Sequence, residues 1–358
     1  MKNIIVLVLL FTSIYAHGQS QQEQAIDLTK QAIKEMDAGY IDQSLNLLKR
    51  AKKLDPLNLQ IDYEIAYAHY LDKDYKSAIK VLDDLSEKWE QNGIVFQMLG
   101  NCYDLIGKRK KAIVTYDKGL EKFPNTGILY LERGNMELFD KNYNEALFYY
   151  EKGIEVDPSF PSNYYWAAKI FLGSTEEVWG MIYGELFMNL ERNTARTAEM
   201  SRLLFNIYKS EIEFVGDTSI SVSFSKNNTI NITDLTDPDQ LKLPYGLMIY
   251  EQLMMKALIG ESEITIGSLS NVRQRFAKQY FDGKSYEEYP NVLFDFHKTL
   301  INEGLFDAYT HWILMKGDED EFSAWKVENE ISYKRFIDWF SENKLEIDET
   351  NLFFRSQY

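Results

Sequence analysis

Apolar residues in the first half of the chain recur with the spacing of amphipathic helices. In residues 93–126 two such stripes follow one another: Phe96, Leu99, Gly100 and Tyr103, then Ala112, Ile113, Tyr116 and Leu120. Positions three and four residues apart lie on one face of a helix, so each stripe predicts a helix with one buried face. Gly107 separates the two stripes and predicts a turn. The pattern therefore indicates two helices that fold back on each other and share an apolar interface.

This pattern of helices repeats at a step of 34 residues. The step relates Ala78, Ala112 and Ala146, and it also relates Gly100 to Gly134, Asn101 to Asn135, Tyr116 to Tyr150, and Pro124 to Pro158. A fixed period of this length is typical of a solenoid, in which each unit buries its apolar face only against its neighbours. Solenoids present long surfaces to other molecules, so the repeat favours binding over catalysis.

Small residues at fixed places in the repeat indicate where the helices approach closely. We expect Gly100 to face Ala112 in one unit and Gly134 to face Ala146 in the next, because larger side chains would hold the helices apart. Glycine accepts a positive φ at no steric cost, so Gly107 is expected to take that conformation in its turn.

These features resemble the tetratricopeptide repeat family. The resemblance extends over about residues 25–194 and is clearest over 59–160. It rests on three features: small residues at the helix crossings, a tyrosine at the start of a second helix, and an Asp-Pro pair at the end of a unit. The tyrosines are Tyr75 and Tyr143, and the pairs are Asp55-Pro56 and Asp157-Pro158. The resemblance implies a stack of helical hairpins whose first helices line a concave surface that binds protein.

Projecting the first helices of successive units gives the candidate partner-binding residues: Tyr63, Tyr67, Tyr70, Asn101, Leu131 and Asn135. An asparagine amide offers a donor and an acceptor, which suits the backbone of an extended peptide. In peptide-binding members of the family, asparagines at matching places bind the ligand backbone. We therefore expect a groove for an extended segment with apolar or aromatic side chains. The alternative stays open that these side chains cover another part of the same protein.

After Pro158 the period fades and the C-terminal half has a different pattern. Apolar stripes predict helices near 176–190, 198–208, 245–258, 269–281, 291–302, 305–316 and 319–343, the last with a break near Glu330. Alternation at Ile220 and Val222, and again at Ile230 and Ile232, predicts a β-hairpin near 219–233 with its turn at Asn227-Asn228. The expected fold is mainly α. A tetratricopeptide-like solenoid with capping helices covers 19–210, and a helical domain with one small β-hairpin covers 211–358.

The N-terminal residues 1–18 have the pattern of a secretory signal peptide. Lys2 precedes a short apolar run, and Ala16 and Gly18 form the small-x-small pattern of a cleavage site. The run is far shorter than the roughly 20 apolar residues that span a bilayer. Cys102 is the only cysteine, so an internal disulfide is excluded, which fits a bacterial envelope protein better than a small secreted eukaryotic one. We expect an exported, periplasmic or secreted protein.

The net charge and the reactive residues exclude several classes of partner and site. The net charge of −16 repels nucleic-acid phosphates and anionic lipid. Asp307 and His311 lie one helical turn apart and could hold a metal, with His297 as the other histidine of this half, but no third ligand is identifiable. No nucleophile or phosphate-binding motif is present. The sequence thus predicts no catalytic residue, metal or cofactor, and Cys102 is expected to be a small core residue.

Two hypotheses follow for the function. The leading one is a non-catalytic protein-binding or assembly module of the bacterial envelope that uses the concave face of the repeat array. Its partner is a protein or an extended peptide segment; nucleic acid and a membrane span are not expected, and the oligomeric state is open. The alternative is an envelope enzyme or glycan-binding protein with its active region in the C-terminal half and the repeats as a docking arm.

Overall fold

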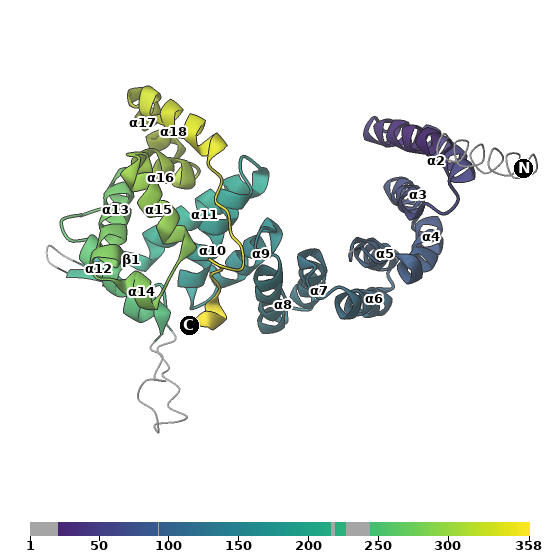
Figure 1. The fold of residues 1–358 in the computed structure, drawn as a ribbon. Coiled ribbons are helices and arrows are strands. Elements are labelled where there is room, and N and C mark those ends of the chain that lie inside the picture. Colours follow the sequence, from purple (N-terminus) through teal and green to yellow (C-terminus); the bar gives the residue numbers. More distant parts are fainter. Residues whose placement is uncertain (1–20, 92, 216–218, 227–243) are drawn as a thin grey trace, which may run out of the picture. The chain divides into compact units, whose positions relative to one another are not determined.

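The computed structural model describes residues 21–358 except 92, 216–218 and 227–243. The chain is mainly helical and divides into two compact units, Met1–Arg133 and Gly134–Tyr358 (Figure 1). The expected signal peptide, the turn at Asn227-Asn228 and the strand with Ile230 and Ile232 lie outside the described residues.

The first unit is a succession of helices packed in chain order. Residues 21–37 are helical and are followed by α2 (Ile41–Leu54), α3 (Leu59–Leu71), α4 (Tyr75–Lys88), α5 (Ile94–Leu105) and α6 (Arg109–Lys122). Each of α2 to α5 packs on the next helix in the chain. Ala66, Ala78, Leu82 and Leu99 share one buried cluster with Cys102, which confirms that the cysteine is a core residue. The predicted helical hairpins are confirmed.

The turns of four successive helix pairs each contain a left-handed residue. Gly107 has a φ value of 75°, as expected, and Gly39, two steps earlier in the repeat, has a φ value of 82°. The equivalent places one step later hold Lys73 and Lys141, with φ values of 61° and 62°. The turn geometry is therefore kept even where the residue is not glycine, at a cost of about 1–2 kcal/mol for each lysine.

The glycines of the helix crossings lie against tyrosine rings of the second helices. A Cβ atom at Gly100 would overlap the ring of Tyr116, and one at Gly134 would overlap the ring of Tyr150. The expectation that these glycines also face Ala112 and Ala146 stays a prediction. A tyrosine from the second helix lies over each glycine, and this ring needs the space that a side chain would take.

The second unit continues with helices and then builds a separate core. After α7 (Gly127–Phe139), which crosses the boundary between the units, come α8 (Tyr143–Val156), α9 (Pro161–Phe171), α10 (Glu177–Leu190) and α11 (Ala195–Glu211). The later elements are the π-helix η2 (Gly246–Glu251), α12 (Gln252–Ala257), α13 (Ile266–Asp282), α14 (Ser285–Glu288), α15 (Val292–Asn302), α16 (Phe306–Leu314), α17 (Glu319–Glu328), α18 (Glu330–Glu342) and the 3-10 turn η3 (Arg355–Gln357).

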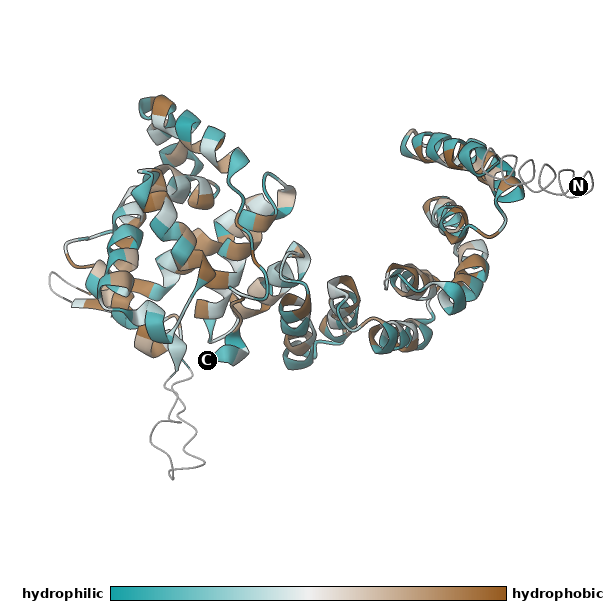
Figure 2. Cartoon of the chain, in the orientation of Figure 1, coloured by the Kyte–Doolittle hydropathy of each residue, from teal (hydrophilic) through white to brown (hydrophobic). Residues whose placement is uncertain are grey.

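Helix α10 forms the centre of this unit. It packs on α9, α11 and α15, and all its residues except the last are buried. Figure 2 shows hydrophobic residues gathered on the inner helices of this unit and hydrophilic residues on its outer helices. The break between α17 and α18 falls at Asn329, next to its predicted place at Glu330.

One small antiparallel sheet is present among the described residues. Strand β1 (Ile212–Val215) pairs with β2 (Ser219–Val222), and Ile212 lies opposite Val222. The predicted strand at Ile220 and Val222 therefore exists, but it pairs with the segment before it. The segment 212–215 continues directly from α11 and was expected to start a helical domain, so its pairing was missed.

Candidate protein-binding site

The tyrosines predicted to bind a partner lie along α3. Tyr67 is 37% exposed, and its ring stacks on that of Tyr70 with the centroids 6.5 Å apart. Tyr63 is half-buried against Trp89, at 5.9 Å between ring centroids. Burial, followed by the charge of Glu64, raises the pKa of Tyr63 to about 12. This helix thus presents aromatic rings to the solvent, with Tyr67 the most accessible of the three.

Asn101 on α5 is held by side chains from the two following helices. Its Oδ1 accepts a hydrogen bond from the Tyr116 hydroxyl at 2.5 Å, and its Nδ2 donates to Glu132 Oε1 at 3.2 Å. Gln97 donates to the same oxygen of Glu132 at 2.9 Å. Leu131, beside Glu132 on α7, is half-buried. The Asn101 amide therefore links α5 to α6 and α7.

Asn135 makes the equivalent contact one repeat later. Its Oδ1 accepts a hydrogen bond from the Tyr150 hydroxyl at 2.9 Å. The same bond thus joins first and second helices in two successive repeats, because both members of the pair recur at a step of 34 residues. The asparagines thus have a packing role that was not predicted, although each lies 15 residues before its tyrosine in both repeats. Their role in binding a peptide backbone stays a prediction.

A cavity of about 770 Å³ lies in the second unit, at the turns between its helices. Its walls come from the end of α7, the start of α8, the end of α9, the loop after α9 and the C-terminal turn. They are formed by Leu138, Tyr143, Asn144, Leu147, Trp166, Lys169, Ile170, Phe171, Gly173, Ser174, Thr175, Glu176 and Arg355. The cavity is not predictable from the sequence, because Arg355 lies far from the other wall residues in the chain.

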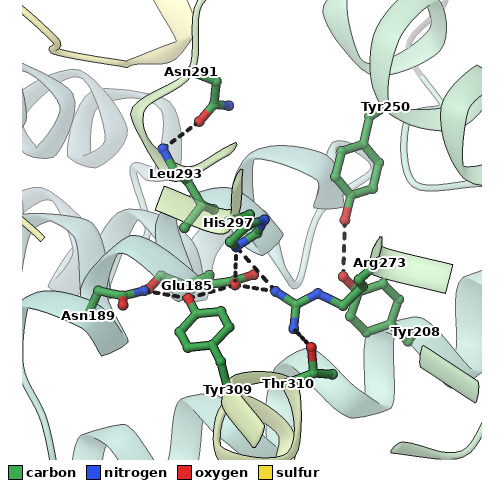
Figure 3. Close-up of polar contacts among 10 residues, drawn as sticks. All are labelled: Glu185, Asn189, Tyr208, Tyr250, Arg273, Asn291, Leu293, His297, Tyr309 and Thr310. Carbon is green, nitrogen blue, oxygen red and sulfur yellow. Dashed lines mark hydrogen bonds and ion pairs between the residues drawn. The ribbon is translucent and has the colours of Figure 1, made fainter. Parts of the chain in front are cut away.

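A buried polar cluster joins four helices of the second unit (Figure 3). Glu185 Oε1 on α10 lies 2.7 Å from His297 Nε2 on α15, and it accepts hydrogen bonds from the Tyr309 hydroxyl at 2.9 Å and from Arg273 on α13. Arg273 also donates to Thr310 Oγ1 on α16 at 3.3 Å. Burial alone would raise the pKa of Glu185, but Arg273 and His297 outweigh it and lower that pKa to about 2.

The interactions of this cluster hold the packed helices together. The cavity beside it has a volume of about 20 Å³, which is room for one water molecule. Burial lowers the pKa of His297, so the imidazole is neutral near physiological pH. Among the residues that the structure describes, His297 meets one carboxylate, that of Glu185, whereas the alternative hypothesis needs a deep polar cleft with a histidine and two carboxylates.

His311 is packed against an aromatic side chain. Its ring stacks on that of Trp325 at a centroid distance of 3.8 Å, and its Nδ1 lies 2.9 Å from the backbone oxygen of Asp307. Asp307 also accepts a hydrogen bond from Ser270. Within the described part of the chain, no group of three or more histidine, cysteine, aspartate or glutamate side chains is placed to hold a metal ion.

Two stretches of the array match models of a known family. Residues 95–126 and residues 129–160 each match a tetratricopeptide repeat model. The chain contains tetratricopeptide repeats. The two matched repeats comprise the helix pairs α5–α6 and α7–α8, and both contain the asparagine–tyrosine hydrogen bond.

Solved structures, among them one of a tetratricopeptide repeat protein, are similar to about half of the chain. TTC0263 of Thermus thermophilus is 14% identical over 50% of this chain and 98% of its own, with a TM-score of 0.42. PilF of Pseudomonas aeruginosa is 17% identical over 53% of this chain and 86% of its own, with a TM-score of 0.45. PilW, a type IV pilus biogenesis factor, is 17% identical over 52% and 84%, with a TM-score of 0.42. No curated protein matches the chain.

A membrane-spanning helix was not expected from the sequence. Among the residues that the structure describes, none of the helices is both long enough and apolar enough to cross a bilayer.

Proposed function

We propose that this protein is a non-catalytic binding or assembly module of the bacterial envelope, and that its tetratricopeptide repeats bind an extended segment of a partner protein along their first helices. The observation that carries the proposal is the tyrosine face of α3. Tyr67 is exposed there, and its ring stacks on that of Tyr70.

The chemistry of this face suits a peptide. Tyrosine supplies a large apolar ring together with a hydroxyl that donates and accepts hydrogen bonds. Because few torsions are ordered when a tyrosine ring is covered, aromatic contact area costs little conformational entropy. Gln97 and Asn101 add carboxamide groups on the next first helix, α5. An extended segment with apolar side chains can meet rings and amides on successive first helices.

The envelope location rests on the sequence. The pattern of Lys2, the apolar run and Ala16-x-Gly18 is that of an exported protein. Export is tested by fractionating cells that express the full chain and comparing the mass of the periplasmic or secreted form with that expected for removal of residues 1–18. A protein that stays in the cytoplasm at full mass would contradict the location and leave the binding proposal standing.

Site-directed photo-crosslinking tests the binding face. A photoreactive phenylalanine analogue replaces Tyr67 in one variant and Val114 in a control variant. Val114 lies on the second helix α6 and is 54% exposed, so both probes are accessible and differ in the face that they report. The crosslinking is done in the cells that make the protein.

We expect a discrete crosslinked adduct with one protein from the probe at position 67 and no adduct from the probe at position 114. The sequence of the crosslinked peptide then gives the partner segment. Equal adducts at both positions, or adducts only at Val114, would assign binding to another surface.

A further inference from the structure

The segment that follows α18, residues 344–358, runs as an irregular and mostly extended chain to the turn η3 (Figure 1). We call this segment the strap. Leu345 and Ile347 are buried, and the residues on either side of each are exposed. The side chains of an extended chain point alternately to its two sides. One side of the strap is therefore covered by the protein, and the other side faces solvent.

An aromatic surface of the second unit receives the far end of the strap. The ring centroid of Phe353 lies 6.0 Å from that of Trp179 on α10 and 5.7 Å from that of Tyr245. Phe353 is 1% exposed. The ring of Tyr358 also lies against Tyr245, at 5.3 Å, and its hydroxyl donates a hydrogen bond to the backbone oxygen of Pro290 at 2.7 Å. The strap thus inserts aromatic side chains between rings from earlier parts of the chain.

Arg355 is the polar anchor of the strap. Its Nε donates to Glu151 Oε1 on α8 at 3.0 Å, and its Nη2 donates to Oε2 of the same carboxylate at 2.7 Å. Its backbone N–H donates to the hydroxyl of Tyr183 on α10 at 2.8 Å. The Glu151 side chain is only 9% exposed. A carboxylate that is so buried needs a cation, and here the strap supplies it in a bidentate pair, which adds geometric specificity to the contact.

These contacts are those of a bound peptide. An extended segment is held by a few apolar and aromatic anchors and by one arginine, the residue types that contribute most to binding at protein interfaces. The residues between the anchors, 348–351, are exposed, and so are Asn343 and Lys344, which connect the strap to α18. A segment with few buried contacts and an exposed connection opens at a lower free energy than the helices beneath it.

We propose that the surface of Glu151, Trp179 and Tyr183 is a peptide-binding site, that the strap occupies it as a tethered ligand, and that a partner segment of the same chemistry displaces the strap. Such a segment has two aliphatic residues at alternate positions, followed by Phe-x-Arg. A short tether holds its ligand at an effective concentration of about 1 mM, so the partner binds in competition with the strap. This inference rests on the proposed protein-binding function but concerns a different surface from the tyrosine face of α3.

Fluorescence anisotropy with the full chain tests this site. The probe is a fluorescein-labelled peptide with the sequence of residues 344–358. In the opened variant, Phe353→Ala with Arg355→Ala, the tethered ligand is weakened and the residues of the site are unchanged. Because the site is then unoccupied for a larger fraction of the time, the probe should bind the opened variant at least about tenfold more tightly than the wild-type protein. A strap with a purely structural role would give no such gain.

Matched controls locate the binding. Lys344→Ala with Glu346→Ala changes two exposed residues of the strap and should leave the affinity for the probe at the wild-type value. Glu151→Gln, added to the opened variant, should weaken probe binding by about tenfold, because the arginine of the probe loses its carboxylate. A comparison peptide with alanine at the places of Phe353 and Arg355 should bind the opened variant at least about tenfold more weakly than the probe does.

Hydrogen exchange in the wild-type protein measures the opening of the strap without any substitution. The Arg355 amide, which is bonded to the Tyr183 hydroxyl, should exchange at least about tenfold faster than the amides of α10. Three results would overturn the inference: equal probe affinity for the wild-type protein and the opened variant, equal binding of the comparison peptide, or exchange of the Arg355 amide together with α10. Each is distinct from a failure of the proposed function, since the crosslinking at Tyr67 reports another face and needs no synthetic peptide.

Discussion

Removing Arg273 is expected to destabilise the second unit strongly, because it leaves the Glu185 carboxylate buried without its main counter-charge. Arg273→Met keeps much of the side-chain volume and deletes the guanidinium. The pKa of Glu185 falls from 4.5 to about 2 in the folded protein, which corresponds to about 3 kcal/mol in favour of the ionised carboxylate. Breaking a buried pair by removing one partner costs about 3–5 kcal/mol. We therefore expect a loss of about 3–5 kcal/mol in the free energy of unfolding.

Urea unfolding followed by tryptophan fluorescence measures this loss. Trp89 is the single tryptophan before residue 134, so the signal comes mainly from the second unit. Arg275→Met is the matched control on the same helix. Arg275 is 40% exposed in its pair with Glu261, and its loss should cost about 1 kcal/mol or less. The pH dependence of the free energy of unfolding is a second readout. The stabilisation by the ionised Glu185 carboxylate is present above pH 4.5 and is lost as the pH falls towards 2.

A double variant separates the pair from its surroundings. Glu185→Leu with Arg273→Met removes both charges, so its cost should be smaller than the sum of the single costs by more than about 1 kcal/mol. If Arg273→Met costs no more than Arg275→Met, or if the two single costs simply add, the cluster does not act as a coupled buried ion pair and our reasoning is refuted.

Three further predictions concern titration and backbone geometry. The wild-type protein should lose stability as the pH falls below 6.5, because burial keeps His297 neutral in the folded state while the unfolded chain takes up the proton; His297→Gln should flatten this part of a urea-unfolding profile. Gly100→Ala should lower stability by about 1–3 kcal/mol through overlap with a buried ring, whereas Gly173→Ala, whose nearest neighbouring atom is 3.7 Å away, should change it by less than about 0.5 kcal/mol in thermal unfolding. Lys141→Gly should raise stability by about 1 kcal/mol in the same assay, since it relieves a left-handed lysine; an unchanged or lower stability would show that the turn carries no strain.

The repeat array was predictable because its signals are local. Ala78 and Ala112 mark helix crossings at a fixed step, and Gly107 marks a turn. The left-handed conformation of Lys73 was not predictable, since lysine carries no signal for it. The contact of Gly100 with the Tyr116 ring was also not predictable, because the rotation of one helix against another depends on how whole side chains pack.

The buried cluster and the turn cavity could not be found from the sequence. Glu185, Arg273 and His297 come from three helices well separated in the chain, and no short motif joins them. Arg355 reaches the cavity from the last residues of the chain. Such sites depend on long-range packing, which a single sequence does not reveal. For the candidate binding residues, the sequence indicated which positions share a helix face, but it did not show that Asn101 is already held by Tyr116.

The most direct test of the central claim is the affinity of the partner segment captured at α3 for a variant of that face. Tyr67→Ala removes an exposed ring with little effect on the core, and Tyr40→Ala removes another accessible ring from a position outside the face. Isothermal titration calorimetry should show Tyr67→Ala weakening binding by about tenfold, or about 1.4 kcal/mol, with Tyr40→Ala unchanged. Equal affinities for the wild-type protein and both variants would contradict the claim that the first helices of the repeats form the binding surface.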